Sequence, residues 1–428
     1  MKIKGHISPA RAGIPICFLL LAGLPSQCMA QSRLSLREAV TKALDSRASL
    51  KAQSERIVAA RGLEKQSGLI ENPTFQFENQ NLRPGQTYGR DVDTYAFLTQ
   101  PLDILGKRKQ RIAVAGKEVA TSEAEYQLAR RQVAQSVKQA YWAARGAQEI
   151  RDLLKATVDN FQGVVDYHSA QLSVGAIAEQ DFLRVRLEGE RLKIAANLAV
   201  IEAVHTRVQL EKEMGQTDFP ELVLTEPLDA ASLSAGKNPL NLLDVQQVLA
   251  QRAEVQVALA ELDAAQAKEK FDTVSARPDL SILYGYKRTQ LADANPDNGT
   301  STAMAGVQIE IPITDRNQGN RAAATAEVQR ARQLLAATQA SVLADYYGAQ
   351  QEYQLRRTEV VENLQPLREH AATISEIAQS AYTQGGTDLL RLLDAARARL
   401  DAEVGYVQGM VEYQQSIVNL ETAEGVAP

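Results

Sequence analysis

Cysteine is almost missing from this 428-residue chain, and its two cysteines, Cys17 and Cys28, both lie near the N-terminus. If that segment is a cleaved export signal, the remaining chain has no disulfide, no thiolate metal site and no cysteine nucleophile. Aromatic residues make up only 5% of the chain, with a single tryptophan. We therefore expect that a large compact core is not the main source of stability.

Other signals are missing as well. No segment after residue 30 contains the ~18 consecutive apolar residues of a transmembrane helix. The net charge of -5 argues against a nucleic-acid partner, which requires a concentrated basic face. The chain has no Walker-type phosphate loop, no paired CxxC and no HExxH, so we expect no enzyme and no cofactor. No metal site is expected either, because the histidines are isolated: His6, His168, His205 and His370.

Residues 1–30 have the layout of an export signal. Basic residues precede the apolar run Ile14–Leu24, which is too short to span a bilayer as a helix. Cys28-Met29-Ala30 then fits a signal peptidase site, with cleavage before Gln31. The alternative is lipidation of Cys28, which is less favoured because the preceding Gln27 is not a small residue.

A large internal duplication organises the rest of the chain. Leu98-Thr99-Gln100-Pro101 is followed by a turn and a long Ala/Gln-rich run, and Ile309-Glu310-Ile311-Pro312 is followed by another, 211 positions later. Each copy reads helix, strand, turn, strand, very long helix, tight turn, long helix. We predict repeat 1 at 31–217, a linker at 218–238 and repeat 2 at 239–428.

Four short segments are predicted as strands, because apolar and polar residues alternate in them: 73–82, 92–101, 278–288 and 303–312. Their aromatic residues are candidates for a lipid-facing surface, or else ordinary apolar-face residues: Phe75, Phe77, Tyr95, Tyr284 and Tyr286. Four strands cannot close a membrane barrel, whose smallest members have about eight, and an open edge in lipid is forbidden. If these strands span a membrane, several copies of the chain must share one barrel.

Very long helices are predicted beside these strands. No proline occurs from Lys107 to Leu172, a length of roughly 100 Å as a helix, and the matching run Asn320–Thr383 has only Pro366. Apolar residues three and four positions apart mark the faces where helices meet. The alternative is a plain coiled coil, which would make the chain a secreted structural protein.

With these features the chain resembles the TolC-type outer membrane efflux proteins, and within them the heavy-metal branch of CzcC- and CnrC-like proteins. The resemblance rests on the segment Gln100–Arg108, where strand meets long helix, on Arg277-Pro278-Asp279-Leu280, and on the repeat layout. It implies a mainly α-helical homotrimer with a small β part. Three chains form a twelve-stranded outer membrane barrel, surrounded by lipid and continued by a periplasmic helical barrel.

The resemblance also implies partners and sites. The partners are a periplasmic adaptor and a proton-driven inner membrane pump of the RND type. The turns between the long helices match the family's adaptor-contacting tips: Val174, Gly175 and Ala176 in repeat 1, and Gln384, Gly385 and Gly386 in repeat 2. The structural alternative is that the two glycines only form tight turns, since such a reversal requires positive φ.

Four further residues match the family's periplasmic mouth. Asp394 matches one of two acidic positions, whereas Arg391 occupies the other and can pair with Asp394 one turn away. Asp181 and Tyr382 match positions that hold the closed mouth by hydrogen bonds across helices. The alternative for Asp181 is a solvated charge or a helix N-cap.

We therefore expect a passive outer membrane channel for divalent heavy-metal cations. Drugs or other small molecules are the alternative cargo.

Overall fold

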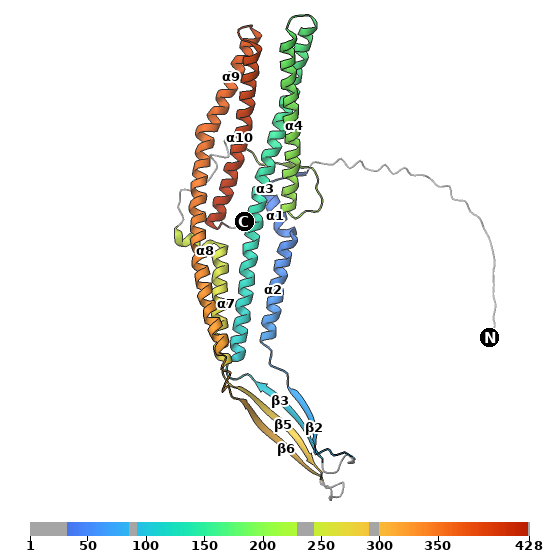
Figure 1. The fold of residues 1–428 in the computed structure, drawn as a ribbon, viewed down its shortest axis with the longest axis vertical. Helices are drawn as coiled ribbons and strands as arrows, with labels where there is room; N and C mark the ends of the chain where they lie inside the picture. The colour runs from blue at the N-terminus through green and yellow to red at the C-terminus, as the bar shows by residue number, and fades with distance from the viewer. Residues whose placement is uncertain (1–31, 85–91, 229–243, 291–298, 427–428) are drawn as a thin grey trace, which may run out of the picture.

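The computed structural model describes residues 32–84, 92–228, 244–290 and 299–426. The molecule is long and narrow, with a sheet at one end, two helical hairpins at the other and long helices between them (Figure 1). Residues 1–31, which hold the predicted export signal, lie outside the described residues, as does 229–238 of the predicted linker. Within the described residues, no helix is both long and apolar enough to cross a membrane.

The elements follow one order twice. The first copy contains α1 (Leu36–Ser46), α2 (Ala48–Ser67), β2 (Thr74–Gln80), β3 (Asp93–Leu102), α3 (Lys107–Ser173) and α4 (Glu179–Glu213). The second contains α6 (Val245–Gln251), α7 (Ala253–Ser275), β5 (Asp279–Thr289), β6 (Thr300–Glu310), α8 (Gln318–Thr358), the π-helix η1 (Glu359–Leu364), α9 (Gln365–Thr383) and α10 (Leu389–Glu424). The predicted duplication and the predicted fold class, mainly helical with a small β part, are confirmed.

The sheet is antiparallel, in the order β2-β3-β5-β6. Its register aligns Phe77 with Ala96, and Ala96 with Tyr286. Within the described residues, β2 and β6 each have one edge without a partner strand.

The helices repeat this lateral order. Beside the sheet, α3 packs between α2 and α7, and α7 packs on α8, which gives α2-α3-α7-α8. In the other half of the molecule, α3 packs between α4 and α10, and α10 packs on α9. Among the described residues, the sheet, the helices beside it and the helices near the tips are thus each four elements wide, with lateral edges formed by β2 and β6, by α2 and α8, and by α4 and α9.

In each repeat, the first helical segment is interrupted at an arginine. Arg47 separates α1 from α2 with φ -62° and ψ 120°, and Arg252 separates α6 from α7 with φ -73° and ψ 125°. Each guanidinium donates to a carbonyl oxygen at the end of the returning helix, that of Glu213 at 2.7 Å or that of Thr422 at 3.3 Å. Both carbonyls lie in the last turn of a helix, where backbone oxygens lack their usual donor four residues on; that of Thr422 also accepts from the amide of the C-cap, Gly425, at 3.0 Å.

The long helix of the second copy contains a π-helix that the first copy lacks. Pro366, the second residue after η1, has no N–H to bond the preceding turn, which accounts for the local widening of the helix. Leu364 of η1 packs against Gly409 of α10, where a Cβ atom would lie 2.2 Å from the Leu364 Cδ1. The glycine therefore makes room for the displaced turn.

A small parallel sheet and the apolar cluster around Tyr141 stabilise the middle of the molecule. The strands β1 (Ser32–Leu34) and β4 (Leu222–Leu224) pair in parallel, although no strand was predicted in the linker. Tyr141 is fully buried against them. Its hydroxyl donates to the Leu34 carbonyl at 2.9 Å and accepts from the amides of Thr225 and Glu226 at 3.2 and 3.3 Å.

Candidate functional site

The two hairpin tips lie at the end of the molecule opposite the sheet (Figure 1). Gly175 has φ +73° and Gly385 has φ +71°, and no atom lies within 4 Å of a Cβ built on either residue. Both turns close with the same pair of hydrogen bonds, including Ala176 N to Gln171 O at 2.9 Å and Gly386 N to Ala381 O at 2.8 Å. The six predicted tip residues are all exposed: Val174, Gly175, Ala176, Gln384, Gly385 and Gly386.

Tyr382 connects the two repeats of the chain just behind the tips. Its hydroxyl lies 2.8 Å from Nε2 of His168, which is only 2% exposed. The His168 Nδ1 lies 2.7 Å from the Val164 carbonyl oxygen. Because that oxygen can only accept, Nδ1 carries the proton and Nε2 accepts from Tyr382. Burial raises the pKa of the Tyr382 hydroxyl, and the nearby Tyr167 and Asp181 raise it further. The bonding partner of Tyr382 in this chain is thus His168, not Asp181.

Asp181 and Asp394 lie on the helices that leave the two tips. Asp181 is in the first turn of α4, where the helix dipole stabilises a carboxylate. It is not the N-cap of α4, because that residue is Ala178. Asp394 and Arg391 are exposed on α10. Among the ion pairs of the described residues, none joins Arg391 to Asp394. The ion pair between Arg391 and Asp394 that the sequence allows is therefore not formed in this structure.

A half-buried ion pair, which we call the seam pair, connects the two hairpins. Arg397 of α10 binds Glu188 of α4 through two nitrogens, with Nε 2.9 Å from Oε1 and Nη2 against Oε2. The Glu188 side chain is 7% exposed, whereas that of Arg397 is 43% exposed. The hydrogen bond raises the pKa of Arg397, and the charges of Glu188, Asp394 and Asp401 raise it further. The seam pair and the His168–Tyr382 bond therefore both connect the two repeats of one chain near the tips.

The sheet separates its side chains onto two faces. Phe75, Phe77, Tyr284 and Tyr286 are 67, 56, 68 and 43% exposed. They share one face with other exposed apolar residues: Leu98, Ile282, Val307 and Ile309. A row of exposed apolar side chains on one face of a sheet is typical of lipid contact.

Tyr95 corrects one sequence prediction. It pairs with Glu78 and Lys287, so it lies on the opposite face from the other four aromatic candidates. Its ring instead lies 4.9 Å from the Lys287 Nζ. The prediction that Tyr95 faces lipid with the others is wrong, because its place in the alternation depends on the strand register.

Sequence reasoning missed His168, Glu188 and Arg397. Each lies singly on a long helix, and only the packing of the two hairpins brings partners together. One signal was available for the helix breaks, since Arg47-Ala48 and Arg252-Ala253 recur at equivalent places in the two copies. Among the described residues, no group of three or more His, Cys, Asp or Glu side chains forms a metal site.

The sequence matches the profile of the outer membrane efflux protein family (OEP) over residues 35–216 and 245–426, one match for each copy. The chain therefore belongs to this family, whose members are outer membrane channels of tripartite efflux systems with a helical extension into the periplasm. These proteins are transporters and not enzymes. Family membership excludes the secreted coiled-coil alternative.

Particular relatives are similar along almost the whole chain. The cobalt-zinc-cadmium resistance protein CzcC of Cupriavidus metallidurans is 23% identical over 392 residues, which cover 92% of this chain and 90% of CzcC. The solved structure of CusC superposes with a TM-score of 0.75 at 20% identity, covering 91% of this chain and 92% of that one. The open-state MtrE channel of Neisseria gonorrhoeae gives a TM-score of 0.73 at 17% identity, covering 91% and 88%.

Proposed function

We propose that three copies of this chain close a single outer membrane channel. The free edges support this assembly, since β2 and β6, α2 and α8, and α4 and α9 all lie at the lateral borders of one chain. Three sheets of four strands make a twelve-stranded barrel, which leaves no unpaired backbone in lipid. The resemblance to TolC-type channels is the reason for three copies and not two or four.

The exposed tips are the docking surface for a periplasmic adaptor, which connects the channel to an inner membrane pump of the RND type. A turn exposed at the end of an elongated molecule is accessible to a partner without rearrangement of the core. The channel has no energy source of its own, and the pump supplies the work. Asp181, Tyr382, Arg391 and Asp394 line the periplasmic mouth, which opens when the two hairpins of each chain move apart.

The cargo is a divalent heavy-metal cation of the kind that CzcC is named for, cobalt, zinc or cadmium, with nickel as a further member of the class. The observation that carries this proposal is the similarity to CzcC over 92% of the chain. A passive conduit requires only weak contacts, because tight binding would prevent release. Drugs and other small molecules remain the alternative cargo.

The experiment is a tolerance profile of a deletion strain. The strain is complemented with the wild-type gene, with Gly175→Trp/Gly385→Trp, or with a matched control, Gly163→Trp/Gly405→Trp, at positions of α3 and α10 where a Cβ meets no described atom within 4 Å. Growth is measured in salts of cobalt, zinc, cadmium, nickel, copper and silver, and in drugs and detergents. We expect metal sensitivity in the deletion strain, restored by the wild type and the control but not by the tip variant.

Two results would contradict the proposal. Sensitivity of the deletion strain to drugs alone would agree with a channel but would show that its cargo is small organic molecules and not metal cations. Full export by the tip variant, at normal protein levels, would sink the assignment of the tips as the adaptor site.

A further inference from the structure

The four connectors between sheet and helices (residues 68–73, 103–106, 276–278 and 311–317) form a collar together with the first turns of α3 and α8 (residues 107–110 and 318–321). All four lie at one level of the molecule, where the ribbon changes from strands to helices (Figure 1). Three of them expose large aliphatic side chains, from 37 to 73% of their area: Leu69, Ile70, Ile104, Leu105, Ile311 and Ile313. Short polar turns would have sufficed to join a strand to a helix, so this apolar exposure requires an explanation.

An arginine accompanies each of these aliphatic segments. Arg111 donates to the Leu69 carbonyl oxygen at 3.0 Å, and Arg277 donates to that of Leu105 at 2.6 Å. Arg316 donates to the Ile313 carbonyl oxygen at 3.2 Å. The same arrangement therefore occurs three times, with a guanidinium held beside the backbone of an exposed aliphatic residue.

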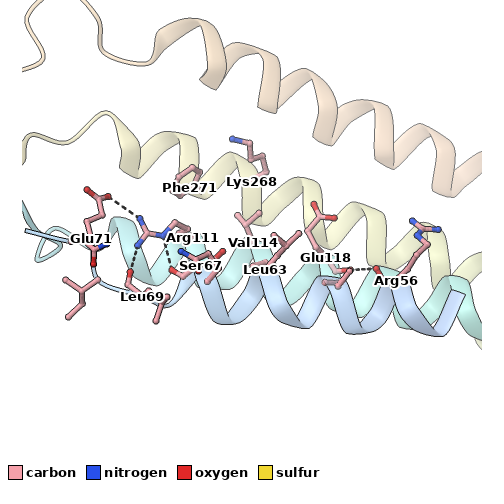
Figure 2. Close-up of a pocket in the computed structure, with 17 residues that line it drawn as sticks. Arg56, Leu63, Ser67, Leu69, Glu71, Arg111, Val114, Glu118, Lys268 and Phe271 are labelled. Carbon is pink, nitrogen blue, oxygen red and sulfur yellow. Dashed lines mark hydrogen bonds and ion pairs between the residues drawn. The ribbon is translucent and has the colours of Figure 1, made fainter. Parts of the chain in front are cut away.

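Figure 2 shows one of these arrangements at the end of a groove of ≈ 960 Å³ over α3, between α2 and α7. Arg111 donates there to the carbonyl oxygens of Ser67 and Leu69, with the Glu71 carboxylate 3.7 Å away. Its remaining partner is Asp103, at 3.6 Å. Arg111 thus fixes the connector through contacts inside the chain.

The basic residues of the collar outnumber the acidic ones that remain available. Asp279 pairs with Lys107 at 2.7 Å, Asp103 accepts from the Arg108 amide, and Asp315 accepts from the Asn317 amide. Among the described ion pairs, none includes the four exposed cations at this level: Lys109, Arg277, Arg316 and Arg321. Among the described residues, two carboxylates near the collar have no ion pair or side-chain hydrogen bond: Glu310, directly beside it, and Glu64, one turn before it. The collar therefore has a surplus of unpaired positive charge.

We infer that the collar binds the anionic phospholipids of the inner leaflet of the outer membrane. The aliphatic side chains reach the acyl region, and the cations meet the phosphates above it. Two observations select this occupant. The aliphatic residues continue the apolar face of the sheet, since Ile311 follows Val307 and Ile309 in the same alternation. The unpaired charge complements a phosphodiester.

A second copy of the chain is the other possible occupant, and Ile104 argues against it. The connector 103–106 follows β3, a central strand, whereas neighbouring copies meet at the edges β2 and β6. Ile104 is nevertheless 63% exposed. A neighbouring copy would lie against the sides of the edge connectors only, so contacts between copies do not account for the exposure of Ile104.

The test is lipid binding by the purified, delipidated channel. Short-chain phosphatidylglycerol, phosphatidylcholine or inorganic phosphate is titrated, and affinity is read from the melting temperature. The variant is Lys109→Gln/Arg277→Gln/Arg316→Gln, and the control is Lys51→Gln/Arg184→Gln/Arg399→Gln, three exposed cations outside the collar. We expect the wild type and the control to prefer phosphatidylglycerol. The variant should bind it about a hundredfold more weakly, since one basic side chain at a membrane surface contributes about a fivefold factor.

The inference rests on the proposed placement of the sheet in a membrane, and its failure differs from the failure of that proposal. Equal stabilisation of the wild type, the variant and the control by phosphatidylglycerol and phosphatidylcholine would refute the binding of anionic lipid by the collar. It would still agree with a sheet placed in a membrane. No stabilisation by either lipid would count against both. A shift produced equally by inorganic phosphate would show a simple anion effect, and loss of the oligomer in the variant would assign the collar to contacts between copies.

Discussion

Removing Arg397 is expected to favour the open channel. The Arg397→Met variant keeps most of the side-chain length but leaves Glu188, 7% exposed, without its bidentate partner. Breaking a buried ion pair on one side costs ~3–5 kcal/mol. Arg397 is itself 43% exposed, and Arg191 lies 3.9 Å from the same carboxylate. Because solvent and this second arginine soften the loss, about 2 kcal/mol is the appropriate figure.

This cost falls on the closed arrangement alone if the hairpins separate on opening. In the open arrangement Glu188 is hydrated, so the variant loses nothing there. Since 1.4 kcal/mol is a tenfold change, about 2 kcal/mol corresponds to a roughly thirtyfold rise in the ratio of open to closed channels. Single-channel recording in planar bilayers measures that ratio directly.

The control is the double variant Glu188→Gln/Arg397→Met. It removes the buried charge together with its partner, so most of the rise should disappear. The reasoning would be refuted if Arg397→Met assembled normally and opened no more often than the wild type. It would also fail if the double variant opened as often as the single one, because the unpaired carboxylate would then not be the cause.

Three further predictions concern stability. Tyr141→Phe leaves the amides and carbonyl around its hydroxyl short of partners, so we expect a loss of about 1–3 kcal/mol in thermal unfolding, against little for the exposed Tyr347→Phe. Gly425→Ala should cost more than Gly385→Ala in the same assay, because both have φ above +70° but only Gly425 would place its Cβ against backbone, 2.9 Å from Gln251. Glu211 is fully buried, neither of its carboxylate oxygens has a hydrogen-bond partner among the described residues, and burial raises its pKa. Its folded form therefore retains the proton that the unfolded chain releases, so stability falls as pH rises above the ordinary glutamate value. Glu211→Gln should melt above the wild type at pH 8, and the difference should shrink toward pH 4.

Much of the architecture was predictable because it is repeated and periodic. The duplication around Pro101 and Pro312, the alternation in the strands and the long proline-free helices are local patterns, and they predicted the family and the mainly helical fold. The glycines of the two tips were equally visible, since a reversal between long helices requires positive φ.

What the sequence could not supply depends on pairings between distant elements. The face of Tyr95 follows from its register with Glu78 and Lys287, and shifting the register by one residue would reverse it. The helix break at Arg47 has no proline or glycine to mark it, and apart from the recurrence of Arg-Ala in the two repeats the sequence does not reveal its contact with the Glu213 carbonyl, far along the chain. His168 was predicted to be an isolated residue for the same reason, since its partner Tyr382 belongs to the other copy.

The most direct test of the central proposal is the native mass of the purified protein in detergent. Closure of the sheet through the β2 and β6 edges, in the manner of TolC-type channels, predicts a particle of three chains and a barrel of twelve strands. A mass of three chains, retained without cross-linking, is the expected result. A stable monomer, or a particle of two or four chains, would contradict the proposed channel.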